Sequence, residues 1–138
     1  MSIAGLDHVA LPSQSPEAMM AFYGALGFEV PDELLWRGVP NPRLSIVCGN
    51  QKINLHTPEE WQDPQFTLRG RTAVPGCGDL CFFWQDSLDA LLAAFERAGA
   101  QVEAGPVQRT GGRDHGRASG VSVYTRDPDG NLLEFILY

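Results

Sequence analysis

The chain has 138 residues, of which 43% are hydrophobic and 20% are charged, and its formal net charge is -7 at pH 7. This composition lies close to the globular average, so we expect one folded domain or two small half-domains sharing a core, and it excludes a disordered or collagen-like chain. The negative charge argues against a nucleic-acid-binding protein, because such proteins need a basic surface that contacts phosphates.

The cellular compartment is predicted from what the sequence lacks. No segment is apolar over the length of a membrane span, and the opening residues MSIAGLDHVALP lack the basic and apolar regions of a secretory signal. We therefore expect a cytoplasmic protein that contacts neither membranes nor nucleic acids. The three cysteines, Cys48, Cys77 and Cys81, match neither a disulfide framework nor C-x-x-C metal spacing, and we interpret them as reduced structural thiols.

The first part of the chain reads as a strand, a helix and a hairpin. A strand is predicted over residues 3–11, followed by a helix for which Ser15 is the expected N-cap and Gly27 the expected C-cap. After an irregular, proline-rich stretch come two candidate strands, 44–48 and 52–56, joined by residues whose glycine and asparagine favour a turn.

The second part repeats the same order. The segment DLCFFW, starting at Asp79, predicts an apolar strand, and a helix runs from about Ser87 to Gly99. A loop is expected next, and GVSVYTRDPDGNLLEFILY then predicts two strands joined by an Asp-Gly turn. We therefore divide the chain into a first module at 1–58 and a second at 78–138, which form a single domain together with the linker between them.

The repeat predicts an α+β fold with helices on the outer face of curved, mixed sheets that enclose a cavity. Side chains alternate between the two faces of a strand, so each strand residue can be assigned to the face that packs on the helices or to the face that lines the cavity. The apolar residues expected on the helix side are Val9, Leu11, Ile53, Leu55, Leu80, Phe82, Leu133, Phe135 and Leu137. The polar residues expected to face the cavity are His8, Asn54, His56, Asp79 and Glu134.

A carboxylate such as Glu134 in a concave, apolar surface is costly unless it is paired, hydrogen-bonded or bound to a metal ion. Histidine, aspartate and glutamate from separate strands form a suitable oxygen and nitrogen site for a divalent ion such as Fe, Mn, Ni, Zn or Co. Two simpler interpretations remain open. The histidines are structural, or Glu134 and His8 form a buried ion pair between the sheets.

The paired units, LDHVAL near the start and DPDGNLLEF near the end resemble the vicinal oxygen chelate superfamily, which includes glyoxalase I, extradiol dioxygenases, fosfomycin-resistance transferases and bleomycin-binding proteins. Within it, KINLH, GDLCF, GPVQRTG and SVYTRDPDGNLLE are similar to small bacterial glyoxalase-like proteins labelled virulence-associated. The resemblance covers nearly the whole chain and implies two tandem βαβββ modules. It says less about the reaction, because one scaffold hosts several chemistries and some pure binders.

The resemblance also implies that His8 and Glu134 are metal ligands, with Glu134 as a catalytic base. Asn54 stands where glyoxalase I has a glutamate, and Asp79 stands where a histidine or glutamine-type ligand is expected. His56 could complete the set, because it shares a face with Asn54, or it simply bonds a neighbour at the strand end. Asn54 is then expected to orient a ligand or the substrate.

The glycine-rich segment VQRTGGRDHGRASG carries Arg109, Arg113 and Arg117, with His115 among them. Arginine presents a planar fork that suits carboxylate or phosphate, so an anionic substrate bound by Arg109, Arg113 and His115 is one interpretation. The other is a mobile, solvated loop whose arginines offset nearby acids.

The leading functional hypothesis is a metal-dependent, glyoxalase-like lyase or isomerase acting on a small anionic substrate that chelates metal through two oxygens. The competing hypothesis is a metal-free binding or sequestration protein of the bleomycin-resistance type, and the third is an Fe(II) extradiol-type dioxygenase. The resemblance further implies a homodimer. Two arrangements of this dimer remain open. Either the two modules of one chain pair with each other, or the modules pair between chains, so that the site combines His8 and Asn54 of one chain with Asp79 and Glu134 of another.

Overall fold

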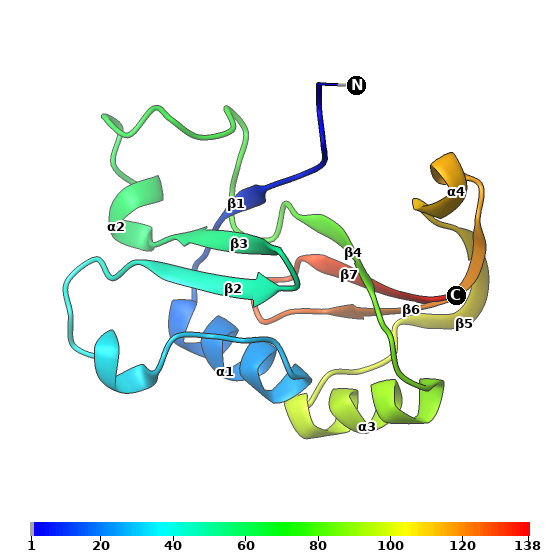
Figure 1. The fold of residues 1–138 in the computed structure, drawn as a ribbon. Helices are drawn as coiled ribbons and strands as arrows, with labels where there is room; N and C mark the ends of the chain where they lie inside the picture. Colours follow the sequence, from blue (N-terminus) through cyan, green and yellow to red (C-terminus); the bar gives the residue numbers. More distant parts are fainter. Residues whose placement is uncertain (1) are drawn as a thin grey trace.

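A computed structural model describes residues 2–138, and its ribbon is shown in Figure 1. The first part of the chain forms β1 (His8–Pro12), α1 (Pro16–Leu26), the short 3-10 helix η1 (Glu33–Leu35), β2 (Leu44–Cys48) and β3 (Gln51–His56). A single helical turn, α2 (Pro58–Trp61), opens the linker. The second part forms β4 (Asp79–Phe83), α3 (Leu88–Ala98), β5 (Ala104–Thr110), the short α4 (Arg113–Gly116), β6 (Ser119–Arg126) and β7 (Leu132–Leu137).

The strands form two mixed sheets that do not join. The three-stranded sheet has the order β1-β3-β2, with β1 parallel and β2 antiparallel to β3. The four-stranded sheet has the order β4-β7-β6-β5, with β4 parallel to β7 and the other pairs antiparallel. Each half is thus a strand, a helix and a returning set of strands, which confirms the predicted α+β architecture.

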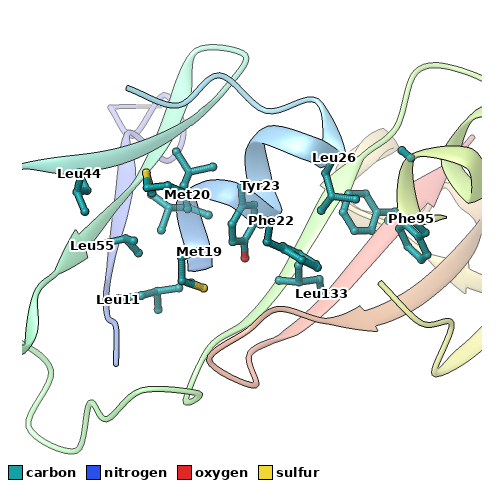
Figure 2. Packing of buried hydrophobic residues seen from close by; sticks show 14 of the residues in the cluster. Leu11, Met19, Met20, Phe22, Tyr23, Leu26, Leu44, Leu55, Phe95 and Leu133 are labelled. Carbon is teal, nitrogen blue, oxygen red and sulfur yellow. The ribbon is translucent and has the colours of Figure 1, made fainter. Parts of the chain in front are cut away.

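Both long helices lie on the same side of the sheets and pack against each other (Figure 1). Beneath them runs one apolar core, in which Met19, Tyr23 and Leu26 of α1 meet Phe95 of α3 and Leu133 of β7 (Figure 2). Every apolar strand residue predicted to face the helices belongs to this core or packs against it. The period-two sorting of the strands is therefore confirmed.

A buried polar cluster fastens the two halves to each other at the β6–β7 turn. The Tyr23 hydroxyl of α1 donates a hydrogen bond to Oδ2 of Asp127 at 2.7 Å, and Asn131 Nδ2 donates to the same oxygen at 2.8 Å. The backbone N–H groups of Asp129 and Asn131 both donate to Asp127 Oδ1 at 3.0 Å. Burial of the Tyr23 hydroxyl, together with the negative charge of Asp127 and the hydrogen bond to it, raises the pKa of Tyr23 far above its usual range.

Four local features differ from the sequence prediction. The first strand begins at His8, and the expected loop before the last hairpin contains the edge strand β5. In the first half the corresponding strand is reduced to one isolated bridge between Glu29 and Val47. The Ser15 side chain makes no cap hydrogen bond, and Asp129 Oδ1 of the second half instead accepts from the N–H groups of Gln14 and Ser15.

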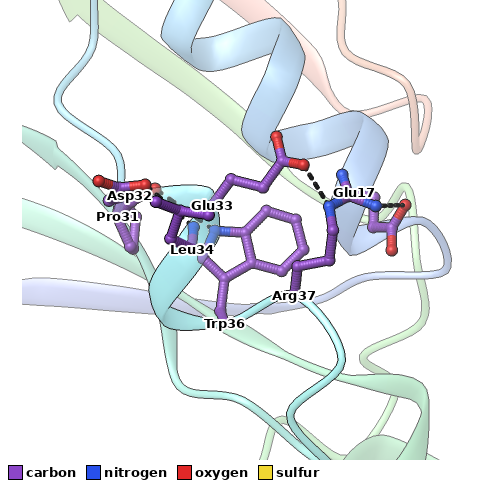
Figure 3. A network of polar contacts seen from close by, with 7 residues as sticks. All are labelled: Glu17, Pro31, Asp32, Glu33, Leu34, Trp36 and Arg37. Carbon is purple, nitrogen blue, oxygen red and sulfur yellow. Dashed lines mark hydrogen bonds and ion pairs between the residues drawn. The ribbon is translucent and has the colours of Figure 1, made fainter.

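The proline-rich stretch after α1 is an ordered turn rather than a strand. Asp32 accepts a hydrogen bond from the N–H of Leu34, and the Trp36 indole N–H donates to the carbonyl of Pro31 (Figure 3). Arg37 forms ion pairs with Glu33 and with Glu17 of α1 (Figure 3). These contacts hold the buried Trp36 ring in the turn. Among residues 2–138, no helix combines the length and apolar character needed to cross a membrane.

Candidate functional site

Each sheet has one face that is turned away from α1 and α3, which we call its open face. On the four-stranded sheet, Cys81 of β4, Glu134 of β7 and Tyr124 of β6 are register partners, so they form one row across the open face. The next row consists of the register partners Phe83, Ile136 and Ser122. The open face therefore combines a carboxylate, a thiol, two hydroxyls and two aromatic rings.

Glu134 is the central side chain of this face. It is half-buried, and its Oε2 accepts a hydrogen bond from the fully buried Ser122 Oγ at 2.6 Å. A carboxylate held by one short hydrogen bond keeps further lone pairs for a proton, a metal ion or a ligand. Its position matches the sequence prediction that Glu134 turns away from the helices.

Cys81 and Asp79 share β4 and lie beside Glu134. Although Cys81 is open to solvent on one side, desolvation of its thiolate raises its pKa to about 12, with further contributions from the charges of Glu134 and Asp79 and from a hydrogen bond with Glu134. Asp79 itself is exposed at the start of the strand. The thiol is therefore protonated near neutral pH and inert as a nucleophile.

The predicted residues of the first half lie on the three-stranded sheet. His8 begins β1 with its side chain 46% exposed, and its Nδ1 lies 2.7 Å from Asp7 Oδ1. This contact favours the tautomer that carries its proton on Nδ1 and a lone pair on Nε2, the form that binds metal ions. Asn54 Oδ1 accepts from Ser45 Oγ at 3.0 Å, and the His56 ring packs edge-on against Phe66 at 5.0 Å between centroids.

One chain does not assemble the predicted ligands. In the part of the chain that the structure describes, no three His, Cys, Asp or Glu side chains are grouped so that they could hold a metal ion. A cavity of about 940 Å³ does lie between the two halves, lined among others by Phe28, Cys48, Cys81 and Phe82, but none of the predicted site residues lines it. The metal set of His8, His56, Asp79 and Glu134 stays a prediction.

The arginine segment lies against the end of the four-stranded sheet. Arg113, at the start of α4, places its guanidinium carbon 3.9 Å from the Phe83 ring centroid and 4.8 Å from that of Tyr138. Arg109 Nε donates to the Tyr124 hydroxyl at 3.0 Å. His115 is exposed and has a left-handed backbone.

Sequence reasoning missed Ser122, Tyr124 and Tyr138 as members of this region. The alternation in GVSVYTR was enough to place Ser122 and Tyr124 on the face opposite Val121 and Val123. The register that sets Tyr124 beside Glu134 was not visible, because it depends on how β6 pairs with β7.

Comparison with known proteins agrees with this architecture. The model of the Glyoxalase/Bleomycin resistance protein/Dioxygenase superfamily matches residues 5–135. Virulence protein STM3117 of Salmonella typhimurium is 33% identical over 141 residues, which cover 100% of this chain and 87% of that protein. The solved structure of an integron cassette protein from the mobile metagenome of V. cholerae is 32% identical, with a TM-score of 0.80 over 100% of this chain and 98% of the other.

A lactoylglutathione lyase from Agrobacterium tumefaciens is also similar in structure. It is 26% identical, with a TM-score of 0.67 over 98% of this chain and 94% of the lyase. The family match begins before β1 and ends within β7, so it includes strands of both sheets. The chain therefore belongs to the glyoxalase/bleomycin resistance protein/dioxygenase superfamily.

Proposed function

We propose that the chain is a glyoxalase-like, metal-dependent lyase or isomerase that acts on a small anionic substrate through two neighbouring oxygens. The observation that carries the proposal is Glu134, a half-buried carboxylate with spare lone pairs at the centre of an open face. Membership of the superfamily and the likeness to a lactoylglutathione lyase support the reaction class. The substrate itself follows from neither.

The donor atoms of the chain fit a divalent metal ion. His8 offers its Nε2 atom, and Glu134 and Asp79 offer carboxylate oxygens, a mixed set that suits Fe, Mn, Ni, Zn or Co. A metal bound there supplies Lewis acidity that polarises the substrate oxygens. Glu134 is the group that takes a proton from the carbon beside a carbonyl and returns it to the adjacent carbon. His56 is a further candidate ligand, and Asn54 orients a ligand or the substrate.

We further propose that two copies of the chain complete the site. Because α1 and α3 pack side by side, the open faces of the two halves turn the same way rather than toward each other (Figure 1). A second copy related by a two-fold axis would set the three-stranded sheet of one copy over the four-stranded sheet of the other. The exposed apolar side chains Ile3, Leu6 and Leu68 lie in segments that rise from this side and suit such an interface.

A metal-free binding protein is the second candidate, and one observation favours it. Both proposed ligands already have hydrogen-bonding partners within the chain, since Glu134 accepts from Ser122 and His8 contacts Asp7. A polar network of this kind is stable without an ion.

Metal content separates the two candidates. We would purify the chain without a histidine tag or chelator and measure bound metals by elemental mass spectrometry in the wild type and in Glu134→Gln. The matched control is Glu96→Gln, the same change on the exposed surface of α3. The proposal expects about one divalent ion per chain in the wild type and control, and none in Glu134→Gln.

A wild type that holds no metal, and whose melting temperature is unchanged by added Mn, Fe, Ni, Zn or Co, would contradict the enzyme and favour the binding protein. If iron is the bound metal, oxygen consumption with catechols tests the dioxygenase reaction directly.

A further inference from the structure

We propose that Arg113, held against the rings of Phe83 and Tyr138, is the residue that binds the carboxylate of a short hydroxy- or keto-acid on the open face of the four-stranded sheet. The inference deepens the proposed function by naming the substrate class and the residue that selects it. It rests on that function for its chemistry, although the binding step is separable from the metal.

Arg113 is positioned by two aromatic rings. Its guanidinium carbon lies 3.9 Å from the Phe83 centroid and 4.8 Å from the Tyr138 centroid, and the two rings are 5.7 Å apart. Contact with ring faces stabilises a guanidinium through cation–π attraction and occupies its planar surface. Its N–H groups make no ion pair within residues 2–138, so they are available for a bidentate carboxylate.

The backbone around Arg113 lies close against the four-stranded sheet. A Cβ at Gly111 would lie 1.8 Å from the Tyr138 hydroxyl oxygen, and one at Gly120 would lie 2.7 Å from the carbonyl oxygen of Leu137. These glycines let the hairpin end lie directly on β7. Asp114 and His115 then adopt left-handed conformations that other residues rarely accept, so the segment has a defined shape. The contact of Arg117 with Asp114 agrees with the alternative in which an arginine of this segment offsets a nearby acid, whereas Arg113 contacts rings instead.

The charge of Arg113 is not neutralised within the chain. Arg37, Arg117 and Arg126 each form an ion pair with a carboxylate. Within residues 2–138, neither Arg113 nor Arg109 has such a partner, although the net charge is -7. Two unpaired guanidinium groups on one face of an acidic protein create a local site for an anion.

Arg113 and the two rings that it contacts, Phe83 and Tyr138, form what we call the arginine platform. The distance between this platform and Glu134 sets the size of the ligand. Phe83 follows Cys81 by two residues on β4, and Cys81 is the register partner of Glu134. Rows two residues apart are separated by about 7 Å along a strand. A carboxylate held by Arg113 therefore brings the next two or three atoms of a short acid toward the Glu134 carboxylate, where a proton is to be moved.

The test is a titration of the metal-free chain followed by NMR, with glycolate as the probe. Glycolate pairs a carboxylate with a neighbouring hydroxyl, and glycolamide has nearly the same shape without the charge. We expect saturable binding of glycolate, with the largest shifts in the ring signals of Phe83 and Tyr138, and binding of glycolamide weaker by about tenfold or more. Inorganic phosphate serves as the second anion, and tighter binding of phosphate than of glycolate would overturn the assignment to carboxylates.

Arg113→Gln should weaken glycolate binding by about tenfold or more, whereas Arg117→Gln should change it by less than about twofold. Arg117 is the matched control, because it lies in the same segment but pairs with Asp114. Arg113→Lys keeps the charge without the planar fork, and we expect intermediate binding and an unchanged fold. Equal binding by wild type and Arg113→Gln, or no saturable binding by the wild type, would overturn the proposal.

The outcome is independent of the metal. Glu134→Gln should still bind glycolate in the metal-free state, since the carboxylate contact is made by Arg113. If metal binding fails but Arg113-dependent glycolate binding is found, the proposed enzyme is wrong and the anion site stands. If the chain binds metal but Arg113→Gln binds glycolate as tightly as the wild type does, only the assignment of Arg113 is wrong.

Discussion

Asp127 and Glu134 lie close together in the sequence, yet they occupy opposite environments. Asp127 is 5% exposed and accepts four hydrogen bonds, from the Tyr23 hydroxyl, the Asn131 amide group and two backbone N–H groups. Glu134 is half-buried and has two hydrogen-bonding partners, the Ser122 hydroxyl at 2.6 Å and the Cys81 thiol. A carboxylate whose lone pairs are all used holds a structure together, whereas one with lone pairs to spare is available for chemistry.

The largest expected effect follows from removing Asp127. Asp127→Ala leaves the buried Tyr23 hydroxyl and the Asn131 side chain without their acceptor, and it removes the link between α1 and the β6–β7 turn. We expect a loss of about 3 kcal/mol or more in the free energy of unfolding, measured by urea denaturation of chelator-treated protein.

Glu134→Ala is the matched comparison, because it deletes a half-buried carboxylate whose hydrogen bonds are with the Ser122 hydroxyl and the Cys81 thiol. It leaves one buried hydroxyl, that of Ser122, without its acceptor, so its cost should be about 1–2 kcal/mol in the same assay, below that of Asp127→Ala. Equal losses for the two variants would contradict the distinction between a structural and a functional carboxylate.

A smaller effect is expected at Cys81, which reports the charge of Glu134. Folding raises the pKa of this thiol from 9.0 to about 12, so the folded chain retains a proton that the unfolded chain releases. The contribution of this thiol to the free energy of unfolding is therefore fully present below pH 9, and it is lost as the pH rises toward 12. We predict slow alkylation of Cys81 by iodoacetamide at pH 9 in a chain with Cys48 and Cys77 changed to Ser.

In the same background, Glu134→Gln removes a charge that disfavours the thiolate, so alkylation of Cys81 should become about threefold faster or more. Glu96→Gln should leave the rate unchanged. Because desolvation is the larger cause of the raised pKa, the variant should remain slower than the unfolded chain. A rate unaffected by Glu134→Gln would show that the two side chains do not interact.

Local sequence patterns predicted the fold well where one face of a helix or strand is buried, because apolar residues then recur at a regular spacing. The helices and the apolar face of each strand followed from spacing, since Leu11, Leu55, Leu133 and Phe135 all lie in the core. The edge strand β5 had no local signature, because AGPVQRT contains glycine and proline and is mostly exposed, so it carries no alternation of apolar residues. Only the resemblance, with its βαβββ modules, implied a strand there.

The candidate site was predicted only in part. The strand positions of Glu134 and His8 followed from alternation, but the spacing of the chain does not say which strands face each other in space. The platform of Phe83, Tyr138 and Arg113 depends on three distant segments and on two glycines that permit close approach. Contacts of this kind follow from tertiary packing and have no local signature.

The central claim, a site completed by two copies, is tested most directly by complementation. Purified His8→Ala and Glu134→Gln chains would be unfolded together without metal, refolded and assayed for bound divalent ion. Each homodimer lacks a ligand at both sites, whereas a heterodimer has one intact site, so random pairing should restore about a quarter of the wild-type metal content. Heterodimers that form, as verified by native mass spectrometry, but hold no more metal than either variant alone would contradict the shared site.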